Sequence, residues 1–193
     1  MPRIHPLESA LVDQIAAGEV IDRPASVLKE LIENSLDADA HQIEVKIKRG
    51  GHDLIQVSDN GCGMDGEDLR LAFQRHATSK VEKLNDLNNI KTLGFRGEAL
   101  PSIASVSRMS ARSSEDGKAS VQIKIHGSEE KSFESISGLR GSTFKVQNLF
   151  YNIPARRKFL KKPETEQGYI NKVMRRFMLG RPDVSFKMKS NDK

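Results

Sequence analysis

The spacing of apolar residues predicts two helices and a hairpin at the start of the chain. Apolar positions recur with a helical period through LESALVDQIAAGEV (7–20) and PASVLKELIENSLDA (24–38). They alternate with a period of two in IEVKIK (43–48) and DLIQVSD (53–59), which are separated by a pair of glycines. Two alternating segments joined by a glycine turn are typical of an antiparallel hairpin.

The remainder of the chain predicts further strands between and after two helices. EALPSIASV (98–106) and ETEQGYINKVMRRFML (164–179) have helical spacing. Five short segments alternate like strands: RMSARS, SVQIKIHG, SFESIS, STFKVQN and, after the last helix, VSFKMK. This order predicts an α/β (α+β) two-layer sandwich, in which helices cover one face of a mixed, mostly antiparallel sheet. Residues 76–97 have weak periodicity and predict a long loop of the kind that usually serves a function.

Composition narrows the class of protein. A chain of 193 residues with 37% hydrophobic and 30% charged residues is typical of a globular domain. No apolar run approaches the roughly 18 residues of a membrane span, and Cys62 is the only cysteine, so no internal disulfide forms. We therefore expect a soluble, intracellular protein with no membrane partner. The net charge of +5 is uneven, because residues 151–193 carry 12 Lys or Arg against 4 Asp or Glu.

The stretch SDNGCGMDG (58–66) contains a G-x-G-x-x-G pattern after a predicted strand. One interpretation is a dinucleotide-binding turn. However, Asp59 lies two residues before the first glycine, where a carboxylate would repel a pyrophosphate. A carboxylate there suits a hydrogen-bond donor, such as the amine of an adenine, and we favour this second interpretation.

The predicted helix 24–38 carries a polar stripe beside its apolar face. Glu30, Asn34 and Asp37 fall within about 60° of one another at the border of that face, whereas Lys29 and Glu33 form an outward i,i+4 pair. Glu30 is placed to polarise a water molecule, and the oxygen of Asn34 is of the type that Mg²⁺ prefers. The alternative is an ordinary solvent-facing edge of an amphipathic helix.

GFRGEAL (94–100) places two glycines ahead of a predicted helix start. Free backbone N–H groups and the helix dipole at such a place attract phosphate, although a flexible linker with a helix cap has the same pattern. No G-x-x-x-x-G-K-[ST] occurs in the sequence, so a P-loop is excluded.

Five segments together resemble a known family: KELIENSLDA, SDNGCGM, RHATSK, TLGFRGEAL and GSTFKVQNLFYNIPARRKFL. In this order they are similar to the motifs of the GHKL (Bergerat-fold) ATPases, and the last two are most similar to the MutL branch of DNA mismatch repair. The resemblance runs from QIAAGEVIDRPASV to KFL and covers most of the chain. Ser142 stands where a threonine is common in the family.

The resemblance implies a role for each matching residue. Glu30 would be the general base, Asn34 the Mg²⁺ ligand and Asp59 the acceptor of the adenine amine, with Gly63 allowing close approach. Thr143 would support the adenine through water. Residues 76–97 would form a lid over ATP. The implied phosphate contacts are Thr78, Ser79, Lys80, Gly94, Phe95, Arg96, Gly97, Glu98, Ala99 and Leu100.

The resemblance also implies a domain organisation. Residues 1–20 would form an N-terminal arm used in dimerisation, residues 21–183 the ATPase domain, and residues 184–193 the start of a second domain that is truncated here. In the family that second domain supplies a lysine to the γ-phosphate. We therefore expect a Mg²⁺-dependent ATPase that is weak or inactive in this chain.

The expected function is an ATP-driven conformational switch of mismatch repair. It would form a homodimer or heterodimer on ATP binding and couple a mismatch-recognition protein to downstream strand processing. Such a protein is cytoplasmic and nucleoid-associated in a bacterium and nuclear in a eukaryote. Two alternatives are another GHKL branch and a DNA-binding module with a vestigial nucleotide site.

The basic C-terminal part predicts non-specific DNA binding. RRKFLKK (156–162) has five cations in seven residues, and further cations follow at Lys172, Arg175, Arg176 and Arg181. Such density suits contact with DNA phosphates. The alternative is a solvated helix face that keeps the protein soluble.

Overall fold

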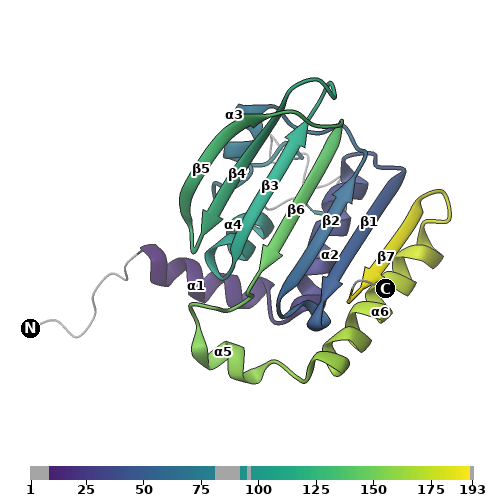
Figure 1. Cartoon of the computed structure of the whole chain (residues 1–193). Helices are drawn as coiled ribbons and strands as arrows, with labels where there is room; N and C mark the ends of the chain where they lie inside the picture. Colours follow the sequence, from purple (N-terminus) through teal and green to yellow (C-terminus); the bar gives the residue numbers. More distant parts are fainter. Residues whose placement is uncertain (1–8, 81–91, 95–96, 192–193) are drawn as a thin grey trace, which may run out of the picture.

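The computed structural model describes residues 9–80, 92–94 and 97–191 and contains one sheet (Figure 1). Its seven strands follow the order β5-β4-β3-β6-β2-β1-β7. All neighbouring pairs are antiparallel except β1 and β7, which are parallel. The strands are β1 (Gln42–Lys48), β2 (Leu54–Asp59), β3 (Arg108–Ser114), β4 (Ser120–His126), β5 (Glu129–Ile136), β6 (Gly141–Gln147) and β7 (Ser185–Ser190).

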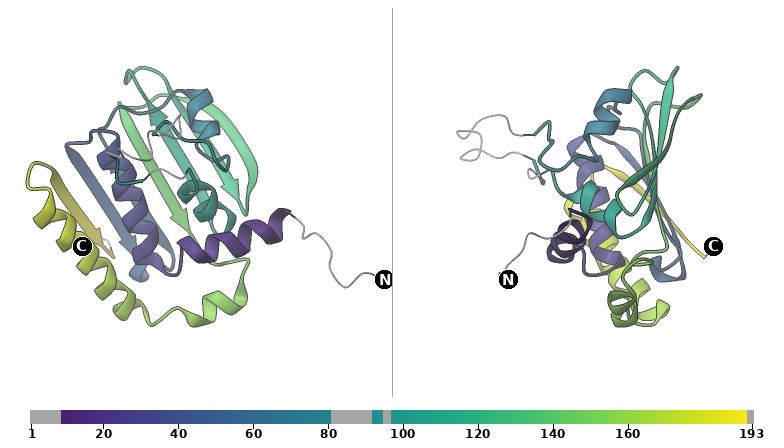
Figure 2. Two further views of the ribbon diagram at one scale, coloured as in Figure 1. Left: turned by 180° about the vertical axis from the view of Figure 1, so that it is seen from behind. Right: turned by 90° about the vertical axis from the view of Figure 1, so that its left-hand side faces the viewer.

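Helices lie on one side of this sheet and leave its other face bare (Figure 2). They are α1 (Ser9–Val20), α2 (Pro24–Asp37), α3 (Gly66–Leu71), α4 (Ala99–Ser105), α5 (Pro154–Phe159) and α6 (Pro163–Gly180), and a single 3₁₀ turn, η1 (Arg49–Gly51), joins β1 to β2. The predicted hairpin and the predicted two-layer sandwich are both confirmed.

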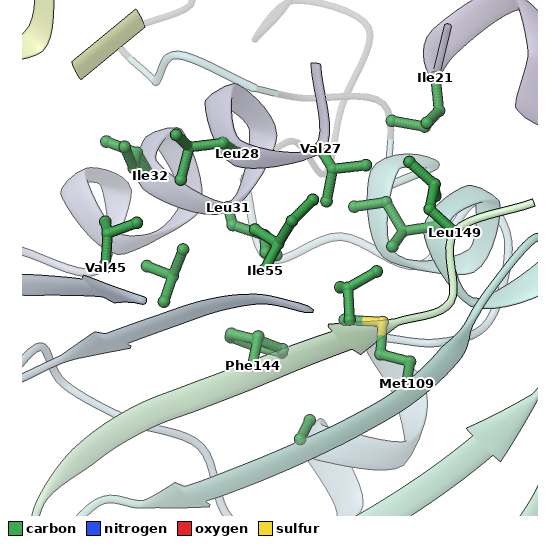
Figure 3. Packing of buried hydrophobic residues seen from close by; sticks show 14 of the residues in the cluster. Ile21, Val27, Leu28, Leu31, Ile32, Val45, Ile55, Met109, Phe144 and Leu149 are labelled. Atoms are coloured by element: carbon green, nitrogen blue, oxygen red, sulfur yellow. The ribbon is translucent and has the colours of Figure 1, made fainter. Parts of the chain in front are cut away.

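The core forms between α2 and the inner face of the sheet (Figure 3). Helical spacing turns Val27, Leu28, Leu31 and Ile32 toward the sheet, and all four are fully buried. Alternate strand residues meet them, including Val45, Ile55, Phe144 and Met109. Each such side chain contributes about 1.5–3 kcal/mol by leaving water, so this contact fixes the height of α2 above the strands.

The last strand differs from the expectation. Residues 184–193 were expected to begin a second domain, but β7 pairs with β1 along its whole length, from Gln42 opposite Ser185 to Ile47 opposite Ser190. Phe186 and Met188 pack against the same core as α2. Residues 185–190 therefore extend the same sheet, and the boundary predicted at 184 does not coincide with a break in it.

Smaller differences concern lengths and short helices. β5 begins at Glu129, three residues before the segment predicted from SFESIS, because it continues the pairing with β4 as far as His126. The short helix α5 begins at Pro154 and was not predicted.

Gly141 allows β6 to approach the end of β2, and its replacement tests this contact. Its φ is +102°, and a Cβ there would lie 2.1 Å from the carbonyl oxygen of Asp59. We expect Gly141→Ala to lower the free energy of unfolding by about 2 kcal/mol or more. Gly168, within α6, has no atom within 4 Å of such a Cβ, so Gly168→Ala should instead stabilise by about 0.5–1 kcal/mol. Urea unfolding of both variants measures the difference, and equal effects would contradict the proposed contact.

Candidate functional site

The carboxylate of Asp59, at the end of β2, is held by three donors from three parts of the chain. Its Oδ2 accepts a hydrogen bond from Ser35 Oγ at 2.9 Å. Its Oδ1 accepts from the backbone N–H of Gly61 at 3.0 Å and of Ser142 at 3.2 Å. Burial raises the pKa of Asp59, and the three hydrogen bonds oppose that shift. The carboxylate therefore has a fixed orientation.

These bonds leave Asp59 one acceptor position. An ionised carboxylate offers about four lone-pair positions, two on each oxygen. Both positions of Oδ1 and one of Oδ2 are used by the donors above. The remaining position on Oδ2 can take one further N–H donor, which is the requirement for binding an exocyclic amine such as that of adenine.

The glycines after β2 serve the packing of the turn. Gly63 has a φ of +76°, and a Cβ there would lie 2.0 Å from the carbonyl oxygen of Ser114 in β3. The next residue, Met64, donates its N–H to Ser113 Oγ at 2.8 Å. Both neighbours of β2 in the sheet are antiparallel to it, whereas a dinucleotide fingerprint needs parallel strands in a βαβ unit. The dinucleotide interpretation is therefore wrong.

The polar edge of α2 carries Glu30 and Asn34. The predicted outward pair is confirmed, because Lys29 Nζ lies 2.8 Å from Glu33 Oε2. Lys29 Nζ also lies 3.3 Å from Glu30 Oε1, and the Glu30 side chain retains 24% exposure. Glu30 is thus half-buried at the border of the core, as its position on the helix predicts.

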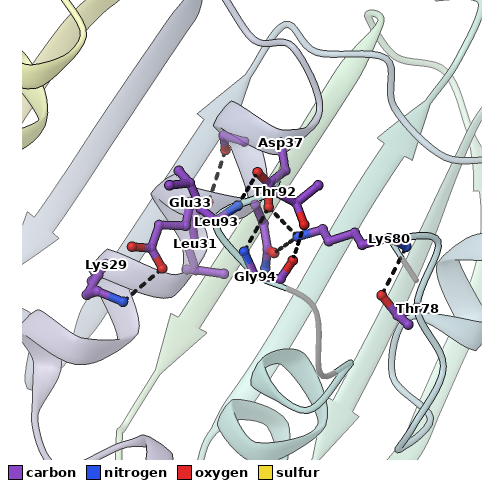
Figure 4. A network of polar contacts seen from close by, with 11 residues as sticks. Lys29, Leu31, Glu33, Asp37, Thr78, Lys80, Thr92, Leu93 and Gly94 are labelled. Carbon is purple, nitrogen blue, oxygen red and sulfur yellow. Dashed lines mark hydrogen bonds and ion pairs between the residues drawn. The ribbon is translucent and has the colours of Figure 1, made fainter. Parts of the chain in front are cut away.

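Asn34 and Asp37 share one cation (Figure 4). Lys80 Nζ donates to Asn34 Oδ1 at 2.9 Å and to Asp37 Oδ2 at 2.6 Å. The amide oxygen of Asn34 therefore faces a positive charge and is free of the helix backbone. An oxygen in this arrangement fits the role of a Mg²⁺ ligand.

Of the residues predicted to contact phosphates, Lys80 and Gly94 reach the end of α2. Thr78 and Ser79 are exposed, and Thr78 Oγ1 accepts the N–H of Lys80 at 3.2 Å. The N–H of Gly94 donates to Asp37 Oδ2 at 3.2 Å. Gly97 has a φ of +63° and meets Ala77, where a Cβ would lie 2.3 Å from the carbonyl oxygen. The predicted contacts that begin or precede α4 are Glu98, Ala99 and Leu100, whereas Phe95, Arg96 and lid residues 81–91 lie outside the described residues.

The position assigned to Thr143 requires correction. Residues alternate along β6, so Thr143 lies on the bare face of the sheet, and its Oγ1 donates to Ser58 Oγ at 3.1 Å. Ser142 is buried on the inner side, with its Oγ 2.8 Å from Ser113 Oγ and its N–H on Asp59. The residue beside the Asp59 carboxylate is therefore Ser142, one position earlier. The frequent threonine of the family at position 142 could have identified Ser142 as the site residue. Ser35, which binds Asp59 from α2, was not predicted either.

The basic residues of the C-terminal part have different surroundings. Arg156 packs against α1, because a Cβ at Gly18 would lie 1.5 Å from Arg156 Nη2. Arg181 pairs with Asp183 at 2.7 Å. The others are exposed: Arg157, Lys158, Lys161, Lys162, Lys172, Arg175 and Arg176.

A second basic surface crosses the bare face of the sheet. Lys189 pairs in register with Lys46, Lys46 with Gln56, and Gln56 with Lys145. The same row continues through Ser110 to Lys124. We call Lys46, Lys124, Lys145 and Lys189 the lysine row.

Among the described residues, no helix is long and apolar enough to cross a membrane.

Comparison with known proteins identifies the family. The model of the histidine kinase-, DNA gyrase B- and HSP90-like ATPases matches residues 22–152. The chain belongs to this ATPase family. The match includes Glu30, Asn34, Asp59 and Ser142, so the Asp59 carboxylate and the polar edge of α2 both lie within the ATPase domain. Membership supports ATPase activity.

Individual relatives confirm the resemblance to MutL. The DNA mismatch repair protein MutL of Actinobacillus pleuropneumoniae serotype 3 is 52% identical over 100% of the chain and 31% of its own length. MutL of Anaeromyxobacter dehalogenans is 50% identical over 98% of the chain and 31% of its length. The chain therefore spans about a third of these curated relatives.

Solved structures of related proteins have the same fold as this chain. The Aquifex aeolicus MutL ATPase domain complexed with ADP superposes with a TM-score of 0.72 at 34% identity, over 89% of this chain and 61% of that one. The N-terminal domain of a DNA repair protein gives a TM-score of 0.79 at 29% identity, over 93% and 52%.

Ser142 and Thr143 form a matched pair of variants on opposite faces of β6. Ser142→Ala keeps the backbone N–H that binds Asp59 but removes the inner-face hydroxyl, which lies 2.8 Å from Ser113 Oγ. We expect the affinity for adenosine to fall by roughly fivefold. Thr143→Val removes a hydroxyl of the bare face and should leave the affinity unchanged. Calorimetric titration of both variants distinguishes the positions, and a loss confined to Thr143→Val would restore the original assignment.

Proposed function

We propose that this chain binds Mg-ATP and hydrolyses it slowly, as the ATPase domain of a MutL-type switch in DNA mismatch repair. The single observation that carries the proposal is the Asp59 carboxylate, which is half-buried, fixed by three hydrogen bonds and left with one position for a donor. A related ATPase domain is described as complexed with ADP, which supports a nucleotide as the ligand.

Each polar residue then has a task. Asp59 accepts the adenine amine and so orients the base, while Lys80 supplies positive charge to the phosphates. Glu30, half-buried on the same helix face, polarises the attacking water. Asn34 Oδ1 would hold a magnesium ion, which would neutralise phosphate charge. The described residues contain no group of three or more His, Cys, Asp or Glu arranged so that it could hold a metal ion. The remaining ligands would be phosphate oxygens and water.

Turnover by this chain is proposed to be weak. The family supplies a lysine to the γ-phosphate from a second domain. The ammonium groups beside Glu30 and Asn34 belong to Lys29 and Lys80, and each is already paired with a carboxylate of α2. Rapid steady-state hydrolysis by the chain would contradict this proposal.

ATP is proposed to join two chains, as a homodimer or heterodimer, through the N-terminal arm (residues 1–20) and the lid (residues 76–97). Slow chemistry is compatible with such a switch, because association and release set its cycle. The dimer would link a mismatch-recognition protein to strand processing at the DNA. Sedimentation with and without ATP tests this step, and a monomer in both conditions would oppose it.

DNA binding is proposed for the exposed cations of residues 157–176 and for the lysine row. Both surfaces suit a phosphate backbone rather than base stacking, because aromatic residues make up only 5% of the chain. Binding of duplex DNA should weaken steeply with salt, and replacing a contacting lysine should reduce the slope of log K against log salt by about one. Arg175→Glu and Lys145→Glu report on the two surfaces separately. A flat salt response would remove the proposal.

Asp59→Asn tests the nucleotide site directly. The amide keeps the shape of the side chain but presents an N–H₂ group where the adenine amine needs an acceptor. We expect the affinity for Mg-ATP to fall on the order of 100-fold in calorimetry, with no binding of NADH by either protein. A DNA-binding module with a vestigial site would show no ATP binding in the unmodified chain. ATP binding that is indifferent to Asp59→Asn would refute the adenine assignment.

A further inference from the structure

Asp37 is the last residue of α2, and its carboxylate accepts hydrogen bonds from two other segments of the chain (Figure 4). Its Oδ1 accepts the N–H of Leu93 at 2.9 Å. Its Oδ2 accepts the N–H of Gly94 at 3.2 Å and the ammonium of Lys80 at 2.6 Å. With all three in place, the Asp37 side chain is only 7% exposed.

The position of Asp37 is electrostatically unfavourable for an acid. The carboxyl end of a helix carries the negative end of its dipole, and Asp37 is the last residue of α2. Burial adds a cost for removing the charge from water. The ammonium of Lys80 and the two N–H groups offset these costs.

The donors around Asp37 are those of an anion site. Consecutive backbone N–H groups beside a glycine, together with a lysine ammonium, form the usual environment of a bound phosphate. Lys80 lies against this backbone, because a Cβ at Gly94 would be 3.5 Å from its Nζ. Lys80 also binds Asn34 Oδ1, so the same ammonium covers the oxygen assigned to Mg²⁺.

We propose that Asp37 is an internal substitute for a nucleotide phosphate. Without nucleotide, its carboxylate holds the donors of Lys80 and Gly94, and Lys80 in turn covers Asn34. A phosphate that takes the single N–H of Gly94 displaces the Asp37 oxygen from it, and as Lys80 turns toward the phosphate it uncovers Asn34 Oδ1. ATP thus binds in competition with a carboxylate of the chain itself. This inference rests on the proposed function, since it assumes that ATP is the ligand.

The competition is confined to the phosphate end of the ligand. The bonds of Asp59 involve Ser35, Gly61 and Ser142, none of which contacts Asp37 in the bonds above. A nucleoside without phosphates therefore has nothing to displace at Asp37. Adenosine and ATP should respond differently to removal of its charge.

Asp37→Asn provides the test, with Asp39→Asn as the matched control. Asn keeps the shape of the side chain but removes the charge that holds Lys80. Asp39 is exposed and lines one groove together with Asp37 and Leu93. We expect Asp37→Asn to bind ATP about fivefold more tightly in calorimetry while its affinity for adenosine is unchanged. Asp39→Asn should change neither. An affinity for ATP that is unchanged or lower in Asp37→Asn overturns the inference.

Amide hydrogen exchange supplies a second readout without any nucleotide. In the unmodified chain the N–H groups of Leu93 and Gly94 should exchange slowly, and Asp37→Asn should speed both. Equal exchange in the two proteins overturns the inference even if the variant binds ATP poorly for other reasons. If the unmodified chain binds neither ATP nor adenosine, the proposed function fails as well. If it binds both and only the effect of Asp37→Asn is missing, this inference fails alone.

Discussion

The burial of one face of α2 against the sheet determines where every group of the nucleotide site lies. Val27, Leu28, Leu31 and Ile32 are fully buried, and this contact leaves the helix no freedom to rotate or slide. Glu30, Asn34 and Asp37 occupy the border of the same helix, so their directions follow from the packing of the apolar residues between them. Ser35 belongs to the buried face itself and reaches down to Asp59. The polar edge of α2 and the Ser35 contact with Asp59 thus both depend on the packing of one helix.

Hydrogen-bond donors stabilise both Asp59 and Asp37, but the two carboxylates differ in their capacity to accept a further donor. Asp59 receives neutral donors only and keeps one acceptor position, whereas Asp37 receives an ammonium and two N–H groups and is occupied. A buried carboxylate without such donors would be costly. The site therefore presents one carboxylate ready for a ligand and one already satisfied, and the two ends of a nucleotide meet different conditions.

Most of the fold followed from the sequence because periodicity reports burial directly. The amphipathic pattern of 24–38, the alternating strands and the glycine turn each appear where they were predicted. The error at Thr143 arose because a shift of one residue in a strand moves a side chain to the other face, and only the pairing of β6 with β2 fixes that register. The role of Asp37 depends on Lys80 and Leu93, which are distant along the chain and have no local pattern that connects them to α2. The parallel pairing of β7 is likewise a long-range contact that alternation alone does not reveal.

The pairing of β7 with β1 also decides how the sheet ends. Without β7, the outer edge of β1 would present unpaired N–H and C=O groups along a strand whose apolar residues alternate with charged ones. Such an edge is a template for association with other chains. The opposite edge, β5, is protected in another way, because its outward residues include Glu129, Glu130, Lys131 and Glu134. The smallest unit of this chain that leaves no unpaired edge at β1 therefore extends through residue 190. We expect a truncation before β7 to aggregate through β1.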